Sequence, residues 1–329
     1  MFSITTLFEN FNTQKVLIIG DVMIDSYLWG KVDRISPEAP VPILNVQKRE
    51  KRLGGAANVA LNIKALGAQP ILCSVLGDDS DADDVLRLMA ESDLSIQGII
   101  KSKNRITSIK HRIMSGAHHL VRVDQEDTHL LNSEEENNIL EKIRGIISTV
   151  QVVVFEDYDK GILTESLIGK VIELARQYGI PTVVDPKKRN FLSYRGVSLF
   201  KPNKKELKEG IKTESSLQTI QEIDTAIEQL QHIIQASSVM ITLSEQGIYY
   251  KSTNTAFQIP AHIRNISDVS GAGDTVISVA ALCLSLGVEP KVMVELANLS
   301  GGLVCEKVGV VPINKEELLQ EALKINLKN

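Results

Sequence analysis

Short apolar runs alternate with amphipathic helical segments along most of this chain, and this alternation constrains the fold more than any other feature. The apolar runs are continuous, which is typical of strands that are buried on both faces of a parallel sheet. Parallel neighbours need a crossover between them, usually a helix, and such crossovers are right-handed. The pattern therefore predicts an α/β fold built on a mainly parallel sheet.

The pattern is clearest in the C-terminal half of the chain. Strands are expected at 152–155, 181–184, 197–200 and 239–243, followed by a hairpin of 249–250 with 256–259. Helices are expected at 134–148, 164–178, from 204 onward, 216–236, 274–286, 290–307 and 314–325. In the N-terminal half, we expect a leading helix within 1–14, strands at 15–20 and 70–76, and helices at 54–66 and 81–92. Two segments interrupt this order, about 26–50 and 96–124, where short alternating runs predict a small lid of strands.

Composition narrows the class of protein. The 329 residues are 43% hydrophobic and 23% charged, as in a soluble globular protein of one large or two modest domains. A net charge of −5 argues against nucleic-acid partners. The sequence shows neither a signal peptide nor an apolar stretch near the roughly 20 residues that span a bilayer. Three cysteines without paired spacing indicate buried thiols in a reducing cytoplasm.

Polar residues follow the first predicted strand and open the next helix. Ligands bind beyond the carboxyl ends of strands in open α/β sheets, so Asp21 and Asp25 are candidates for holding substrate hydroxyls. Gly54 and Gly55 permit close approach of a ligand, and Asn58 could bind a polyol beside them. Each of these residues also has a structural interpretation, as a turn aspartate or a helix-start amide.

The second lid segment carries a basic set at strand spacing. Lys110 and Arg112 are two residues apart and share a face, with His111 between them and Arg122 on the next run. A basic face on a lid would suit a phosphorylated substrate. The alternative is a solvated edge strand that its charges protect from pairing.

One stretch, 264–281, combines glycine, a small residue and an acid before an apolar helix. The amides of Gly271, Ala272 and Gly273 and the positive end of the helix dipole would form an anion site. Asp274 would repel a phosphate there, unless its carboxylate acts as a base on a hydroxyl that attacks phosphorus. The competing interpretation is a glycine turn with an acidic cap.

Taken together, these motifs resemble the ribokinase-like (PfkB) carbohydrate kinases along essentially the whole chain. The shared features are G-G-x-x-N at 54–58, N-x-x-E at 203–206 and D-x-x-G-x-G-D at 268–274. Within that family, W-G-K-V-D-R-I-S-P-E-A-P-V-P (29–42), G-G-A-A-N-V-A-L-N-I (54–63), E-D-Y-D-K-G (156–161) and K-P-N-K-K-E (201–206) are similar to the D-glycero-D-manno-heptose-7-phosphate kinases. Ser270 departs from the family pattern, which commonly has Thr there, but it keeps the hydroxyl.

The resemblance assigns roles to individual residues. It implies that Asp274 is the catalytic base, with Gly271, Ala272 and Gly273 as its anion hole. Nucleotide-binding positions would be Asn203, Lys204, Lys205, Glu206, Thr242, Ser244, Gly247 and Asn298, with Asn203 and Glu206 organising Mg²⁺ through water. Substrate-binding positions would be Asp21, Asp25, Gly54, Gly55, Asn58, Lys110, Arg112, Arg122, Asp185 and Lys187, and the last lysine joins the three lid cations as a candidate for holding the substrate phosphate.

The implied fold is a three-layer α/β/α domain with a small β lid. The implied reaction is ATP-dependent phosphorylation of D-glycero-β-D-manno-heptose 7-phosphate at O1, on the route to ADP-heptose for lipopolysaccharide. We expect one kinase domain over 1–329, without a cytidylyltransferase domain, in a cytoplasmic homodimer that forms through the lid. Two alternatives stay open: a kinase of this fold for another sugar, sugar phosphate or nucleoside, and a catalytically silent sugar or nucleotide sensor.

Overall fold

The main sheet is built from the short apolar runs of the sequence. The computed structural model describes residues 3–116, 118–262 and 264–325. Within these ranges, one nine-stranded sheet has the order β13-β12-β11-β10-β9-β8-β1-β4-β5. Its strands are β1 (Lys15–Gly20), β4 (Gln69–Gly77), β5 (Ile99–Ser102), β8 (Val152–Glu156), β9 (Thr182–Asp185), β10 (Leu199–Phe200), β11 (Ser238–Thr242), β12 (Ile248–Ser252) and β13 (Ala256–Ile259). All neighbours from β11 to β5 pair in parallel, and β12 and β13 add an antiparallel hairpin, which confirms the predicted mainly parallel sheet.

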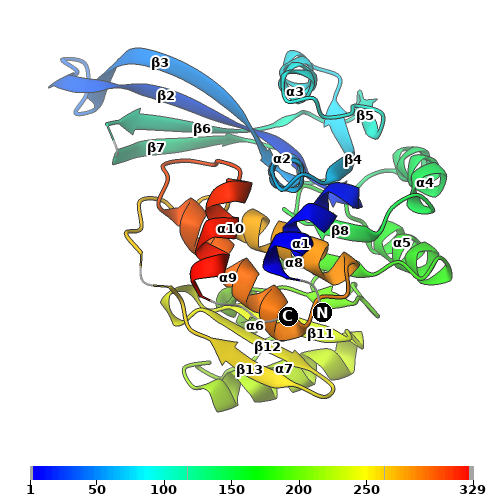
Figure 1. The fold of residues 1–329 in the computed structure, drawn as a ribbon. Helices are drawn as coiled ribbons and strands as arrows, with labels where there is room; N and C mark the ends of the chain where they lie inside the picture. The colour runs from blue at the N-terminus through cyan, green and yellow to red at the C-terminus, as the bar shows by residue number, and fades with distance from the viewer. Residues whose placement is uncertain (1–2, 117, 263, 326–329) are drawn as a thin grey trace.

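Helices cover both faces of this sheet (Figure 1). Successive strand residues point to opposite faces, so Val16 and Ile18 join one apolar cluster while Leu17 and Ile19 join the other. The first cluster contains side chains of α1 (Ile4–Asn10), α2 (Ala56–Ala65), α3 (Ser80–Glu91), α8 (Ala272–Ser285), α9 (Pro290–Cys305) and α10 (Lys315–Lys324). The second contains those of α4 (Ser133–Ile147), α5 (Glu165–Gln177), α6 (Lys204–Gly210) and α7 (Ile220–Ile234). The result is the three-layer α/β/α arrangement that the resemblance implies.

Several helices start at a residue whose side chain caps the first turn. Asn132 accepts the backbone N–H of Glu135, whose carboxylate accepts the Asn132 N–H in return, and this reciprocal pair starts α4. Thr219 and Glu222 start α7 in the same way. None of the helices in the described ranges combines the length and the apolar character needed to cross a membrane.

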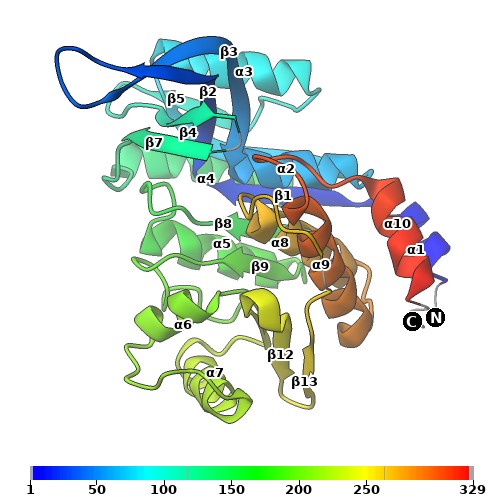
Figure 2. The same ribbon diagram turned by 90° about the vertical axis from the view of Figure 1, so that its left-hand side faces the viewer.

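A second sheet, which we call the lid, stands beside the main one. It contains β2 (Val22–Ile35), β3 (Pro42–Gly55), β6 (Ser108–Ser115) and β7 (His118–Gln125) in the order β3-β2-β6-β7. The long β2–β3 hairpin extends past the body of the molecule, and β6 and β7 run beneath it (Figures 1 and 2). Because β2 follows β1 after a single residue, the lid is connected directly to an inner strand of the main sheet.

The lid begins and ends at different residues from those expected. Strands β2 and β3 reach further in both directions than 26–50, and the second lid segment begins at Ser108 rather than near residue 96. The intervening β5 pairs with β4 in the main sheet. Its Ile99 and Ile100 pack against the apolar clusters on opposite faces of that sheet, which is why this short run does not belong to the lid. Residues 1–2 of the expected leading helix and residue 117 of the lid segment lie outside the described ranges.

Candidate active site

The first turn of α8 contains the glycine and acid pattern of 271–274. Gly271 caps the helix with φ = 79°, a left-handed conformation that favours glycine. A Cβ at this position would lie 2.9 Å from Asn58 Nδ2, so the close approach of α2 also requires glycine. The helix begins at Ala272, two residues before the predicted start, and therefore Ala272 and Gly273 belong to the turn whose amide groups are available to an anion.

Both oxygens of the Asp274 carboxylate are held by side chains from other elements. Asn58 Nδ2 of α2 donates to Asp274 Oδ2 over 2.7 Å, and Tyr158 Oη donates to Asp274 Oδ1 over 2.8 Å. The carboxylate is 4% exposed. Burial raises its pKa to about 6, although both hydrogen bonds and the nearby Lys201 act to lower the pKa. At neutral pH this group is therefore mostly an oriented carboxylate that can accept a proton.

The titration of Asp274 leads to a pH prediction. A base works only when deprotonated, so turnover should fall as the pH drops through about 6 and reach a plateau above it. The hydrogen bond from Asn58 lowers the pKa, so Asn58→Ala should move the acid limb of the profile to higher pH. The measurement is kcat against pH with saturating substrates. A profile that is flat from about pH 5 to pH 8 would contradict the assignment of Asp274 as the base.

Carboxylates and lysines gather at the ends of the central strands. Asp185 ends β9 beside Glu156, which ends β8. Lys201 follows β10 and lies 2.7 Å from Asp185 Oδ2, and Lys187 Nζ lies 3.6 Å from Asp185 Oδ1. Burial alone would raise the pKa of Asp185, but the two lysines outweigh it and keep that pKa below its usual value. These charges therefore form a buried and nearly compensated cluster behind Asp274.

Glu156 is the exception in this cluster. It is completely buried, and neither carboxylate oxygen has a hydrogen-bond partner in the described structure. Burial, followed by the charges of Asp185 and Asp274, raises its pKa well above the usual value. Sequence reasoning passed over Glu156, Lys201 and Tyr158 as site residues. The available signal was their position at or just after strand ends, the same rule that made Asp21 a candidate.

The predicted sugar-side aspartates have partners within the protein. The Asp21 carboxylate accepts the backbone N–H groups of Tyr158 (2.8 Å), Lys160 (3.2 Å) and Ile162 (3.2 Å). It thereby orders the loop that brings Tyr158 to Asp274. Asp25, on β2, forms a buried ion pair with Arg112 of β6.

The glycines before α2 provide the space that this arrangement needs. A Cβ on Gly54 would come 2.3 Å from Asp25 Oδ2, and one on Gly55 would come 2.3 Å from the Asp21 carbonyl. Both glycines therefore lie against the predicted sugar-side aspartates. The structure thus places these four residues next to one another, and their role toward a sugar stays a prediction.

On the expected nucleotide side, Asn203 and Glu206 contact each other. The Asn203 side chain accepts the Glu206 N–H and Glu206 Oε2 accepts the Asn203 N–H, each over 2.8 Å, so the N-x-x-E spacing is a capping box for α6. Glu206 Oε1 lies 2.5 Å from Lys187, which links this corner to the acidic cluster. Thr242 forms a bridge with Asn203 across the sheet ends.

The other expected nucleotide positions are spread over three elements. Lys204 and Lys205 follow on α6, where Lys205 is exposed. Ser244 and Gly247 form the turn into β12, and Asn298 of α9 donates to the Pro260 carbonyl (2.8 Å) just after β13. These residues thus lie on different elements of the fold. Their role toward a nucleotide stays a prediction.

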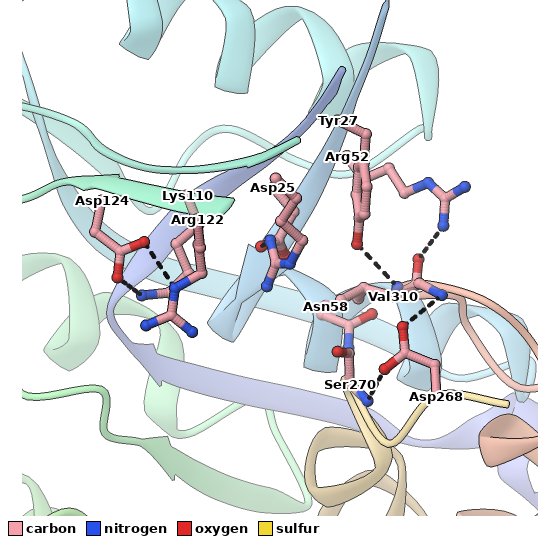
Figure 3. Close-up of polar contacts among 12 residues, drawn as sticks. Asp25, Tyr27, Arg52, Asn58, Lys110, Arg122, Asp124, Asp268, Ser270 and Val310 are labelled. Atoms are coloured by element: carbon pink, nitrogen blue, oxygen red, sulfur yellow. Dashed lines mark hydrogen bonds and ion pairs between the residues drawn. The ribbon is translucent and has the colours of Figure 1, made fainter. Parts of the chain in front are cut away.

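The basic lid residues do share one face. Arg112 lies opposite Arg122 on β7, and Lys110 lies opposite Asp124. Each cation contacts a carboxylate. Arg122 Nε lies 3.0 Å and Lys110 Nζ 3.6 Å from Asp124 (Figure 3). Arg112 contacts Asp25, and Lys110 also lies 3.5 Å from Glu126. An incoming phosphate would therefore compete with these carboxylates. The alternative interpretation was a solvated edge strand that its charges protect from pairing. It does not account for Arg112, because this side chain is only 10% exposed.

Comparison with known proteins identifies the family. The model of the pfkB family of carbohydrate kinases matches residues 13–317. The bifunctional protein HldE of Methylobacillus flagellatus is 39% identical over 307 residues, and that of Helicobacter pylori is 36% identical over 305. These alignments cover 93% of this chain but 62% and 65% of the relatives, so the chain spans less than two thirds of their length.

Solved structures show the same fold at low sequence identity. Phosphofructokinase-2 from Escherichia coli in complex with potassium matches with a TM-score of 0.80 and 19% identity, covering 95% of this chain and 100% of that one. Arabidopsis thaliana ribokinase, complexed with ribose and ATP, matches with a TM-score of 0.71 and 15% identity, covering 93% and 99%. With the family match over residues 13–317, and with an oriented acid at the start of α8, the chain belongs to the pfkB family of carbohydrate kinases.

Proposed function

We propose that this sugar kinase transfers the γ-phosphoryl group of ATP to O1 of D-glycero-β-D-manno-heptose 7-phosphate and forms the 1,7-bisphosphate. The observation that carries the proposal is the buried Asp274 carboxylate, which Asn58 and Tyr158 orient beside the amides of 271–273. The heptose is supported by the resemblance of 29–42 and 156–161 to heptose-7-phosphate kinases and by relatives that are 34–39% identical. The choice of this heptose narrows the sugar-kinase activity of the family to one substrate.

The reaction needs positioning, a base and charge neutralisation more than covalent chemistry. Asp274 accepts the proton of the anomeric hydroxyl while O1 forms a bond to the γ-phosphorus. The bond between that phosphorus and the bridging oxygen breaks, and ADP leaves. The amides of Ala272 and Gly273 receive the charge that develops on the transferring group.

The residues present fit a magnesium ion that is held mainly through water. Mg²⁺ usually keeps several waters and binds one or two carboxylates together with substrate phosphates. In the described ranges, no group of three or more His, Cys, Asp and Glu side chains is arranged to hold a metal directly. Asn203 and Glu206 would hold the ion through water beside the ATP phosphates, because their side-chain oxygens already contact the capping-box N–H groups and Lys187. When bound, the ion neutralises charge on those phosphates.

A panel of acceptors tests the proposed substrate. ADP release should be fast with the heptose 7-phosphate and at least tenfold slower, as kcat/KM, with the same heptose lacking the phosphate. Faster turnover of fructose 6-phosphate, ribose or a nucleoside would replace the heptose with another acceptor and keep the kinase. Failure of every acceptor, with ATP binding intact, would favour the silent sensor and contradict the proposal.

Arg122 offers a direct test of the phosphate-holding face. Its side chain is 58% exposed, so Arg122→Ala should not disturb folding. A charge-assisted hydrogen bond is worth about 1.5–3 kcal/mol, which corresponds to a tenfold or greater rise in KM for the phosphosugar. The KM for ATP should not change. Arg144→Ala, on the exposed face of α4, is the matched control, and equal KM values for both variants would remove Arg122 from the site.

We also propose that the enzyme is a homodimer in which lid sheets cover each other. The lid face that lies opposite Arg112 and Arg122 carries an apolar row, because Leu28, Ile113 and Val121 are cross-strand neighbours. Val121 is 51% exposed. An exposed apolar sheet face of this kind is typical of an interface. Sedimentation of the purified protein distinguishes a dimer from a monomer.

A cytoplasmic location completes the proposal. Cys73, Cys283 and Cys305 are all free and buried. Burial raises the pKa of the Cys73 thiol to about 12, so this group behaves as an inert apolar side chain. Free thiols and the use of ATP both suit a reducing cytoplasm.

A further inference from the structure

One carboxylate ties together the two loops that meet beside the start of α8. Asp268 Oδ1 accepts the backbone N–H of Ser270 over 2.9 Å, and its Oδ2 accepts the N–H of Gly309, also over 2.9 Å. Partial burial acts to raise the pKa of Asp268, but the hydrogen bonds from Ser270 and Gly309 outweigh it and hold that pKa below its usual value, so the carboxylate stays charged. The position of the loop before Gly271 therefore depends on the position of the turn at 308–310.

The lid holds that turn from the other side. Tyr27 Oη accepts the N–H of Val310 over 3.3 Å, and Arg52 Nη1 donates to the Val310 carbonyl over 3.1 Å (Figure 3). Tyr27 comes from β2 and Arg52 from β3, so both strands of the long lid hairpin contact the same residue of the turn. The two contacts use both the N–H group and the carbonyl group of Val310, and therefore fix the orientation of its backbone.

Packing leaves little freedom at this junction. Gly309 has φ = 77°, and a Cβ there would lie 2.7 Å from Arg52 Nη1 and 3.2 Å from Tyr27 Oη. On the other side of the turn, a Cβ on Gly271 would lie 3.4 Å from Val310 Cγ1. The turn is therefore packed between the lid and the glycine loop, and a shift of one side is transmitted to the other.

The same tyrosine contacts the substrate side of the lid. The guanidinium of Arg112, which pairs with Asp25, lies 5.4 Å from the centre of the Tyr27 ring, and that of Arg52 lies 5.0 Å from it. Both distances are within the range of cation–π contacts, so both guanidinium groups stabilise the position of the ring. A continuous series of contacts thus leads from the expected sugar site, through Tyr27 and the 308–310 turn, to Asp268 and the loop before Gly271.

We propose that Arg52 and Tyr27 are positioning residues, which hold the 308–310 turn and, through Asp268, place the 270–273 loop to receive the transferring phosphoryl group. Correct seating of the lid hairpin is then a condition for catalysis as well as for holding the sugar. The inference rests on the proposed phosphoryl transfer. It differs from a binding role, because neither side chain needs to contact either substrate.

Arg52→Ala tests the proposal, with Arg49→Ala as the matched control on the exposed part of the same strand. A misplacement of about 1 Å can lower a rate about a hundredfold, so kcat should fall tenfold or more in Arg52→Ala. The KM values for both substrates should stay within about threefold, and Arg49→Ala should behave as the wild type. A rise in the KM for the phosphosugar with kcat unchanged would make Arg52 a binding residue and overturn the proposal.

Hydrogen exchange provides a readout that does not depend on turnover. The Ser270 and Gly309 amides, which donate to Asp268, should exchange at least several-fold faster in Arg52→Ala than in Arg49→Ala. Tyr27→Phe keeps the ring and removes only the acceptor for Val310, and it should show the same change if Arg52→Ala does not fold. Unchanged exchange in the folded variants would overturn the proposal. If the wild type itself is inactive, the proposed function is refuted. The exchange rates then still decide whether Arg52 and Tyr27 hold the 308–310 turn.

A double variant tests whether the contacts act in series. If Arg52 works through Asp268, Arg52→Ala combined with Asp268→Asn should lower kcat little further than the more damaging single change. Multiplication of the two single effects would show that the residues act independently, and would contradict the proposed series of contacts.

Discussion

Asp274→Asn is expected to lower kcat at least a hundredfold, with ATP affinity within a few-fold of the wild type. General-base assistance is typically worth about 10²–10⁴-fold in rate. The amide of asparagine cannot accept the hydroxyl proton, but it has nearly the same shape. Its oxygen can still accept the Asn58 hydrogen bond, and its nitrogen can donate to Tyr158 Oη. The fold and the amides of 271–273 should therefore be preserved.

The measurement separates chemistry from binding. Steady-state ADP release gives kcat, and calorimetric titration with a non-hydrolysable ATP analogue gives the affinity. Asp224→Asn is the matched control. Asp224 lies on α7 and pairs with Lys251 of β12, away from the start of α8. Turnover of Asp274→Asn within tenfold of the wild type would show that another group takes the proton.

Lys201→Met should produce the largest loss of stability among single changes near the site. Lys201 is 3% exposed and its ammonium group lies 2.7 Å from Asp185 Oδ2. Methionine fills similar volume without charge, so Asp185 would stay buried near the carboxylates of Glu156 and Asp274. Removing one partner of a buried ion pair costs about 3–5 kcal/mol. The free energy of unfolding should fall by that amount at neutral pH, as measured by urea denaturation.

The loss should depend on pH in a defined direction. In the wild type the pKa of Asp185 lies below its usual value. Its ionised form therefore stabilises the fold at pH values above the usual pKa, and this contribution is lost as the pH falls through the lowered pKa. Without Lys201 the pKa rises, and the cost of the buried charge disappears as the pH falls and the carboxyl is protonated. The difference between variant and wild type should therefore shrink toward pH 5. Lys324→Met, which removes an exposed partner of Glu321, is the control and should leave the urea midpoint of unfolding unchanged. If Lys201→Met has the same urea midpoint as the wild type, the buried ion pair does not stabilise the fold as argued.

Much of the architecture could be predicted because it depends on local patterns. Continuous apolar runs such as 152–155 place side chains on both faces of a sheet, and the structure buries every residue of β8. The lid strands were harder to delimit, because β5 carries the same short apolar signal as a lid strand. Whether such a run pairs with β4 or with the lid depends on contacts with distant residues, which the run itself does not encode.

The site was predictable wherever a residue follows a strand or opens a helix. Asp21, Asn58 and Asp274 fit that rule, and the structure places them together around Tyr158. The rule does not say what each group does there. Asp21 accepts three backbone amides, and the N-x-x-E pair of 203–206 caps its own helix, so spacing alone does not separate a ligand from a structural partner.

The sequence by itself determined the parallel α/β class, the order of elements, and the glycine turn that leads to Asp274, because periodicity and turn chemistry are local properties of the chain. Only the tertiary structure decided the state of the groups at the site. Among the described residues the Glu156 carboxyl has no hydrogen-bond partner, Lys201 compensates Asp185, and Tyr27 and Arg52 reach the 308–310 turn. Burial and electrostatic compensation depend on residues that are more than a hundred positions apart in the chain or lie on separate strands, and folding alone brings them within a few ångströms of one another.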